Sequence, residues 1–137
     1  MISVILTDRE IFLSEAISQV ESHDSGAIAT FSGNVRSLDG GKEVSSLSYE
    51  IHPQTEASLR EVVNEVASRH HVAKVAVAHR YGEILIGETA FIVAVASEHR
   101  GEAFATCIEI VDEVKTRIPI WKHQVFADGT DEWVNCA

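Results

Sequence analysis

The sequence predicts one α+β domain over residues 1–137, built from a mixed sheet and three main helices. Three observations support this prediction. The chain has 137 residues, of which 45% are hydrophobic and 23% charged, as in a single folded domain. Apolar residues recur at helical spacing in three segments, and they alternate or run continuously in the segments between. The resulting order of elements is β-α-β-β-α-β-β-α-β, without repeats or linkers.

The N-terminal half is predicted to contain a strand, a helix and a hairpin. The opening run ISVILT is rich in β-branched residues, as strands are. Residues 7–22 space their apolar side chains as a helix does, with Thr7 or Asp8 as the N-cap. Residues 27–37 and 44–52 have strand character and are separated by LDGGKE, whose Gly pair favours a tight turn. We therefore expect these two strands to pair as a hairpin.

The C-terminal half is predicted to contain two more helices. Residues 53–71 carry one apolar stripe at helical spacing, with Pro53 in the first turn. A second long helix is expected over residues 99–117, with Ser97 as its N-cap. Strands are expected at residues 72–81, 88–97 and 119–127, followed by a turn and the terminal WVN. The second of these strands is apolar enough to be central in the sheet.

The charge balance excludes some classes of function. Lys and Arg number 11 against 21 Asp and Glu, so the formal net charge is -10 and the pI is about 5.0. Broad binding to nucleic acid or anionic membranes needs a basic face and is not expected. The start MISVILTDRE lacks the features of a secretion signal, and no apolar run is long enough to cross a membrane, so we expect a cytoplasmic protein.

Cysteine and histidine spacing indicates no metal site. Cys107 falls in an apolar helical pattern and is expected to be a buried structural thiol. Cys136 has no neighbour that would activate it and is given no catalytic role. His23, His52 and His79 lack the H-x-x-x-H or H-x-E spacing of metal ligands, so we predict no metal.

Positive charge is concentrated at the end of the last helix, where Lys115, Arg117 and Lys122 lie within eight residues. Lys115 follows Val111 by four positions and so lies at the edge of the expected buried stripe, where burial would lower its pKa and make it a better nucleophile. The alternative is that Lys115 extends to water or neutralises the helix C-terminus, as Arg117 is expected to do. If one face of its strand is core, Lys122 either borders that core or points to a cleft, and an ordinary solvated lysine is the alternative. The stripe expected to be buried comprises Ala103, Phe104, Cys107, Ile108, Val111, Val114 and Ile118.

A second group of cations begins the same helix. His99 and Arg100 fall in its first turn, where the helix dipole favours anions, so a bound phosphate or carboxylate would stabilise them. Local pairing with Glu98 or Glu102 is the alternative. Arg36 follows a predicted strand, at the kind of strand-to-loop edge where binding residues collect.

Four motifs in order, GAIATFSGNVR, HRYGEILIGE, SEHRGEAF and VDEVKTRIPIWKHQ, resemble those of the large, catalytic subunit of molybdopterin synthase. The resemblance extends from about residue 26 to Trp133, and its most specific part is a helix ending in K-T-R-x-P that passes directly into x-W-K. It implies an α/β-hammerhead-like fold. It also implies a sulfurtransferase of molybdenum cofactor biosynthesis, which converts cyclic pyranopterin monophosphate to molybdopterin.

The resemblance implies two kinds of partner. In this family both sulfurs come from the thiocarboxylated C-terminal glycine of a small ubiquitin-like sulfur-carrier subunit, so the large subunit needs no cofactor of its own. Two large subunits form a homodimer, and one small subunit at each end completes a heterotetramer. The resemblance places this reaction in the cytoplasm.

Carried over by position, the family's pocket lysines fall on Lys115 and Lys122, which would be the catalytic residues. Its pocket arginine falls on Arg36 and its His-Arg pair on His99 and Arg100, which would bind the phosphate and the pterin. Lys115 would lie nearest the incoming tail and polarise the thiocarboxylate or the acyl intermediate, or link covalently to substrate. Lys122 would donate or accept protons in ring opening and elimination.

The chain departs from the family at two places. Gln124 stands two positions after the second lysine, where relatives often carry a carboxylate. The terminal WVNCA lacks the basic residue that often reaches the neighbouring subunit's pocket. Either Arg36 and the His-Arg pair bind the anion alone, or another basic residue such as Lys42 contributes.

Two other classes of function remain open from the sequence. One is a regulatory domain that binds a small ligand without reacting with it, and the other is an interaction scaffold for a ubiquitin-like partner. Two lysines that converge on one pocket beside an anion site favour an enzyme. Turnover with a thiocarboxylated small subunit and the pterin precursor would separate these classes.

Overall fold

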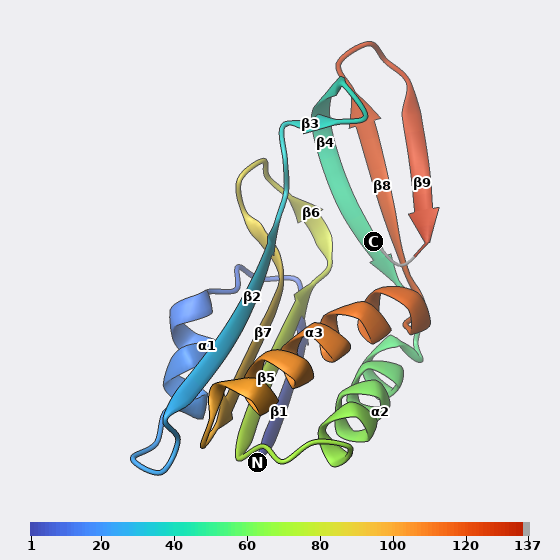
Figure 1. The fold of residues 1–137 in the computed structure, drawn as a ribbon. Coiled ribbons are helices and arrows are strands. Elements are labelled where there is room, and N and C mark those ends of the chain that lie inside the picture. The colour runs from blue at the N-terminus through green and yellow to red at the C-terminus, as the bar shows by residue number, and fades with distance from the viewer. Residues whose placement is uncertain (136–137) are drawn as a thin grey trace.

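The computed structural model describes residues 1–135 and confirms the α+β fold with three helices (Figure 1). Cys136, for which the sequence predicts no catalytic role, lies outside the described residues. The elements in chain order are β1 (Ile2–Thr7), α1 (Leu13–Val20), β2 (Ala27–Asn34), β3 (Leu38–Asp39), β4 (Lys42–Ile51), α2 (Thr55–Ser68), β5 (Lys74–Arg80), β6 (Gly82–Ile84), β7 (Thr89–Ser97), α3 (Arg100–Arg117), β8 (Ile120–Phe126) and β9 (Asp131–Asn135).

A four-stranded sheet forms the centre of the molecule, with strand order β1-β5-β7-β2. β1 runs parallel to β5, whereas β7 is antiparallel to both of its neighbours, β5 and β2. α1 covers one face of this sheet, and α2 and α3 cover the other (Figure 1). β7 is therefore buried on both sides, which explains its unbroken apolar run and confirms that it is a central strand.

The two faces of β7 carry side chains of different kinds. Ile92, Ala94 and Ala96 belong to the cluster beneath α1, while Val93 and Val95 belong to the larger cluster beneath α2 and α3. This alternation follows from the two-residue period of a strand. None of the helices within residues 1–135 is both long and apolar enough to cross a bilayer.

A second sheet extends from the first, with strand order β3-β4-β8-β9 and with β6 paired to β4. β4 and β8 are antiparallel along most of their length, from Val44 opposite Phe126 to Ile51 opposite Ile120. β6 follows β5 almost directly and so connects the two sheets. In Figure 1 the second sheet projects beyond the C-terminal end of α3. The corner between α3 and β8 therefore lies at the junction of the two sheets.

The predicted pairing of residues 27–37 with residues 44–52 is wrong. β2 pairs with β7 in the central sheet, and the partner of β4 in the hairpin is β3, which is only two residues long. The turn itself lies where the sequence predicts it. Gly40 and Gly41 have φ values of 58° and 81°, the positive values that a two-residue type I′ turn requires.

The predicted N-caps of α1 and α3 are also wrong. α1 begins later than expected, after Phe12, and neither Thr7 nor Asp8 caps it. The Ser97 hydroxyl donates a hydrogen bond of 3.2 Å to the carbonyl oxygen of His71 instead of capping α3. The N-cap residues are Phe12 for α1 and His99 for α3, and neither makes a side-chain capping hydrogen bond.

The buried stripe predicted for α3 is only partly correct. Ala103, Cys107 and Val114 are buried as expected, but Phe104 and Ile108 are 58% and 61% exposed. The helix therefore presents apolar side chains to solvent as well as to the core. Burial raises the pKa of the Cys107 thiol to about 11, which agrees with a structural thiol.

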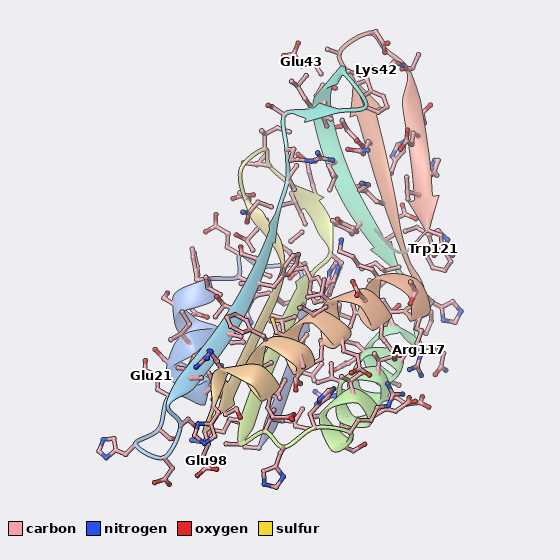
Figure 2. All side chains as sticks on the ribbon, viewed as in Figure 1. Glu21, Lys42, Glu43, Glu98, Arg117 and Trp121 are labelled. Atoms are coloured by element: carbon pink, nitrogen blue, oxygen red, sulfur yellow. The ribbon has the colours of Figure 1, made fainter. Side chains whose placement is uncertain are left out.

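Ion pairs connect α2 to α3 on the solvent side. Arg117 contacts Glu65 of α2 at 2.8 Å and Glu113 of its own helix at 2.6 Å. Arg69, directly after α2, pairs with Glu109 and with Glu65. The hydrogen bond from Arg117 is the largest cause that lowers the pKa of Glu65. Arg117 thus has the structural role predicted for it, and it lies at the end of α3 beside α2 (Figure 2).

Leu59→Ala should reduce the free energy of unfolding by about 2–5 kcal/mol, because Leu59 is fully buried in the core and its truncation leaves a cavity. Leu85 is 61% exposed and provides a matched control, for which Leu85→Ala should change stability by less than about 0.5 kcal/mol. Urea denaturation measures both. Equal losses in the two variants would contradict this description of the core.

Candidate active site

A cavity of about 150 Å³ lies where the two sheets meet. Its walls come from β2 and the segment after it, and from β3, β4, β5, β7, α3 and β8. Three of the predicted cations, Arg36, Lys115 and Lys122, line it together. A larger groove of about 340 Å³ between α1 and β1 contains none of the predicted residues. The smaller cavity is therefore the candidate active site.

A sharp corner after α3 brings the two lysines to one cavity. Ile118 takes an extended conformation, with φ of -84° and ψ of 142°, and its side chain is buried. The hydroxyl of Thr55, which is fully buried, donates a hydrogen bond of 2.7 Å to the carbonyl oxygen of Pro119. The start of α2 thus holds the corner, so Lys115 at the end of α3 and Lys122 in β8 line the same space.

Lys115 has the electrostatic setting that the sequence predicts for a reactive amine. Burial lowers its pKa, and repulsion by Lys122 lowers it further. The side chain nevertheless keeps access to solvent. At a given pH a larger fraction of Lys115 is therefore the neutral amine than for an ordinary lysine, which favours nucleophilic or basic chemistry.

Arg36 extends from a loop whose backbone is held in place. The backbone N–H of Val35 donates to Glu88 O at 2.9 Å, and that of Gly87 donates to Val35 O at 2.8 Å. The Arg36 side chain is 75% exposed, and its Nη2 lies 3.4 Å from Oδ1 of Asp39. Arg36 can therefore contact an anion at the cavity mouth without losing a buried interaction.

His79 also lines the cavity, and a search for metal-ligand spacing overlooks it. Its ring packs on Phe91 and against the edge of Tyr49, with centroid distances of 5.2 Å in both cases. Nδ1 lies 2.9 Å from the carbonyl oxygen of Arg80, which can only accept, so Nδ1 carries the proton. Burial lowers the pKa of His79 to about 4, so the ring is neutral and Nε2 is an acceptor. The signal in the sequence was one histidine within the apolar run KVAVAHR.

His99 and Arg100 lie at the other end of α3 and do not line the cavity. The helix from Arg100 to Lys115 spans about 22 Å at 1.5 Å per residue. Figure 2 shows Glu98, just before α3, at the opposite end of the molecule from the β3–β4 hairpin. Among residues 1–135, neither cation forms an ion pair with Glu98 or Glu102. The Glu102 carboxylate instead contacts the His70 ring and the backbone N–H of His71, in the segment after α2.

Gln124 replaces a carboxylate that relatives often carry, and Lys42 was a candidate for the missing basic residue. The two residues lie in different parts of the second sheet. Gln124 is 3% exposed, and its Nε2 donates a hydrogen bond of 2.6 Å to Oδ2 of Asp39. This bond is the largest cause that lowers the pKa of Asp39. Lys42 lies at the hairpin tip (Figure 2), where it pairs with Asp128 at 3.1 Å and donates to Thr130 at 2.8 Å. The structure therefore gives no support to Lys42 as an anion-binding residue.

The cavity is poorly suited to a metal cation. Within the described part of the chain, no three His, Cys, Asp or Glu side chains gather as a potential metal site. Arg36, Lys115 and Lys122 would also repel a metal ion. A metal-free site stays a prediction.

Known proteins are similar to the chain over most of its length. Residues 6–117 match the family model described as MoaE protein. A molybdopterin synthase catalytic subunit from Thermoplasma volcanium is 34% identical over 131 residues, which are 95% of this chain and 96% of that relative. The solved MoaE protein of Burkholderia ambifaria is 31% identical, with a TM-score of 0.83 over 99% of this chain and 90% of that one. The solved molybdopterin synthase of Staphylococcus aureus is 25% identical, with a TM-score of 0.85 over 97% and 96%.

Lys115 should react with an amine-directed acylating reagent severalfold faster than Lys74, which lies outside the cavity, because its lowered pKa leaves more neutral amine at pH 8. Lys122→Gln removes a repelling charge, raises the pKa of Lys115 and should slow its labelling. Mass spectrometry of the labelled peptides measures both rates. Faster labelling of Lys115 in the Lys122→Gln variant would contradict the electrostatic account.

Proposed function

The chain belongs to the MoaE family of molybdopterin synthase catalytic subunits, and we propose that its cavity converts cyclic pyranopterin monophosphate to molybdopterin with sulfur from a thiocarboxylated partner. The observation that carries this proposal is the convergence of Lys115, Lys122 and Arg36 on one cavity in a chain of net charge -10. Cations concentrated there favour two anions, the substrate phosphate and the thiocarboxylate. Because the partner supplies the sulfur, the chain needs no cofactor of its own.

Each sulfur transfer forms two bonds between heavy atoms and breaks two. The thiocarboxylate sulfur bonds to a carbon of the pterin side chain, and an oxygen leaves that carbon with a proton. Water then cleaves the acyl–sulfur bond, so the sulfur stays on the pterin and the tail leaves as an ordinary carboxylate. Two tails are consumed for each product. The chain's own residues must therefore bind two anions, move protons and admit one water molecule in each transfer.

The cavity residues suit these tasks in different ways. Lys115 has a lowered pKa and is assigned to the thiocarboxylate end, where it polarises the acyl carbonyl or links covalently to substrate as a free amine. Lys122 is assigned the proton transfers of ring opening and elimination. Arg36 lies at the mouth with most of its side chain exposed and is assigned to the phosphate.

The proposed sulfur donor is a small ubiquitin-like subunit whose C-terminal tail enters the cavity. A volume of about 150 Å³ admits a narrow chain but no bulky side chains, which suits a tail that ends in glycine. The relative from Thermoplasma volcanium is named a catalytic subunit, which implies a second kind of subunit in that enzyme. We expect one small subunit for each large one, and the cytoplasm stays the expected compartment.

A second copy of this chain is the proposed partner of the exposed face of α3. Phe104 and Ile108 are more than half exposed and lie on one helical stripe with Val111. Together with β2, this stripe lines an apolar groove of about 240 Å³. Arg100 and Lys115 continue the stripe at its two ends. Apolar surface bordered by charge in this way is typical of an interface between proteins.

Antiparallel packing of two α3 helices would bring the remaining predicted residues to the cavity. A two-fold interface uses the same patch on both subunits. Residue 108 lies about midway between Arg100 and Lys115, so an axis near it would place Arg100 of the partner subunit beside Lys115. His99 of the partner subunit, the preceding residue in the chain, would lie near the same cavity. The homodimer would thus supply the phosphate-binding pair that a single chain holds about 22 Å away.

Lys115→Ala should lower product formation by about 10²–10⁴-fold, because the variant lacks the amine assigned to the sulfur-transfer step. The assay combines the purified chain, a thiocarboxylated small subunit and the pterin precursor, and it measures dithiolene product. Lys74→Ala is the matched control and should keep wild-type activity. Full activity of Lys115→Ala would overturn the assignment, and binding of the small subunit without turnover by the wild type would indicate a scaffold.

Ile108→Glu should convert the dimer to monomers and reduce activity with it, because the two new carboxylates would face each other near the two-fold axis without partners. Analytical ultracentrifugation measures the mass. Leu85→Glu is the control, since Leu85 is equally exposed but lies outside α3. A dimer that survives Ile108→Glu would show that the chains associate through another surface.

A further inference from the structure

The candidate active site contains one negative charge among its cations. Arg36, Lys115 and Lys122 line the cavity, and within the described residues Asp39 is the only carboxylate that lines it with them. The sequence alone does not reveal that Asp39 lines the cavity, because Asp39 lies next to the glycine turn and not in a catalytic motif. Its position in the cavity therefore needs an explanation of its own.

Gln124 holds the Asp39 carboxylate. Gln124 lies two residues after Lys122 in β8, so both side chains are on the same face of the strand. Its buried amide donates to Oδ2 of Asp39 at 2.6 Å, while Oδ1 faces Nη2 of Arg36 at 3.4 Å. One oxygen is thus fixed by the protein, and the other is directed to a cation at the cavity mouth.

The hairpin delivers Asp39 to this position. β3 ends at Asp39, and the chain reverses through Gly40 and Gly41, both with positive φ. Asp39 pairs with Lys42 in the β3–β4 register, and β4 in turn pairs with β8. The contact between residues 39 and 124 therefore depends on two strand registers and on the tight turn.

We propose that Asp39, held by Gln124, is a positioning residue of the cavity, which keeps the Arg36 guanidinium over the mouth and balances the charge of Lys122. The inference rests on the proposed function for the identity of the anion that Arg36 receives. Arg36 has no other ion pair among residues 1–135, and its side chain is largely exposed. Without Asp39 it would sample many rotamers and lose entropy on binding an anion.

Charge alone makes the opposite prediction, which gives the proposal a clear test. Asp39→Asn removes a negative charge next to an anion site, so simple electrostatics predicts tighter binding of inorganic phosphate. Positioning predicts about tenfold weaker binding, because the charge-assisted contact to Arg36 is lost. Isothermal titration calorimetry with inorganic phosphate distinguishes the two, and Arg36→Gln should weaken binding at least as much as Asp39→Asn.

Exchanging the acid and the amide sharpens this test. Gln124→Glu sets two carboxylates against each other and should also weaken phosphate binding at pH 8. The double variant Asp39→Asn with Gln124→Glu rebuilds one acid and one amide in contact, and it should recover most of the wild-type affinity. Asp128→Asn is the matched control, since Asp128 anchors the same hairpin through Lys42 but lies outside the cavity.

Three results would overturn the proposal. Phosphate binding by Asp39→Asn as tight as that of the wild type would show that Asp39 does not position Arg36. A double variant no better than Asp39→Asn, or an equal loss in Asp128→Asn, would indicate that Asp39 merely fastens the hairpin. The binding assay needs neither the small subunit nor turnover, so failure of the sulfur-transfer assay and failure of this inference are separate outcomes.

Discussion

The hydrogen bond from the Thr55 hydroxyl to Pro119 O holds the corner on which the candidate site depends. Thr55 is fully buried and begins α2, so the turn between α3 and β8 is fixed to the core rather than left as a surface loop. Ile118, the residue before Pro119, is buried in the same core and so fixes the turn as well. Because the corner is rigid, a helix and a strand can each present one lysine, Lys115 and Lys122, to the same small cavity.

The cavity concentrates cations within an acidic chain, but burial is the largest cause of the lowered pKa values of Lys115 and His79. Lys115 loses proton affinity through burial and through the nearby charge of Lys122. His79 is buried in the same wall and stays neutral at neutral pH. The Asp39 carboxylate, held by a hydrogen bond from Gln124, supplies one compensating negative charge. The site is therefore preorganised for anions and holds a neutral acceptor, a combination that suits proton transfer beside a bound phosphate.

The features that could be predicted from sequence are those that a local period encodes. The apolar run of β7, the stripe of α2 and the position of Lys115 at the edge of α3 each follow from spacing along one segment. The partner of β4 could not be predicted, because β2 and β3 are both next to it in sequence and only the central sheet decides between them. The contact of Asp39 with Gln124 joins residues 85 positions apart and depends on strand register.

Phe104 and Ile108 show a different limit. Their spacing correctly indicates an apolar face of α3, but spacing does not tell which molecule covers that face, and the single chain leaves both exposed. The same helix carries Lys115 at one end and His99 and Arg100 at the other, and a straight helix of 18 residues cannot bring its own ends together.

Both ends of α3 can serve one substrate only if two chains share the site. The first turn of α3 has free amides and a positive dipole, so His99 and Arg100 are unfavourable there until an anion binds. In the proposed dimer the substrate phosphate would be that anion, placed between the start of one α3 and the end of the other. Formation of the dimer would then complete the site, since each chain would contribute its lysines to one cavity and its helix start to the other. Activity would accordingly require the association of two chains, whereas the fold of each chain depends on its own core.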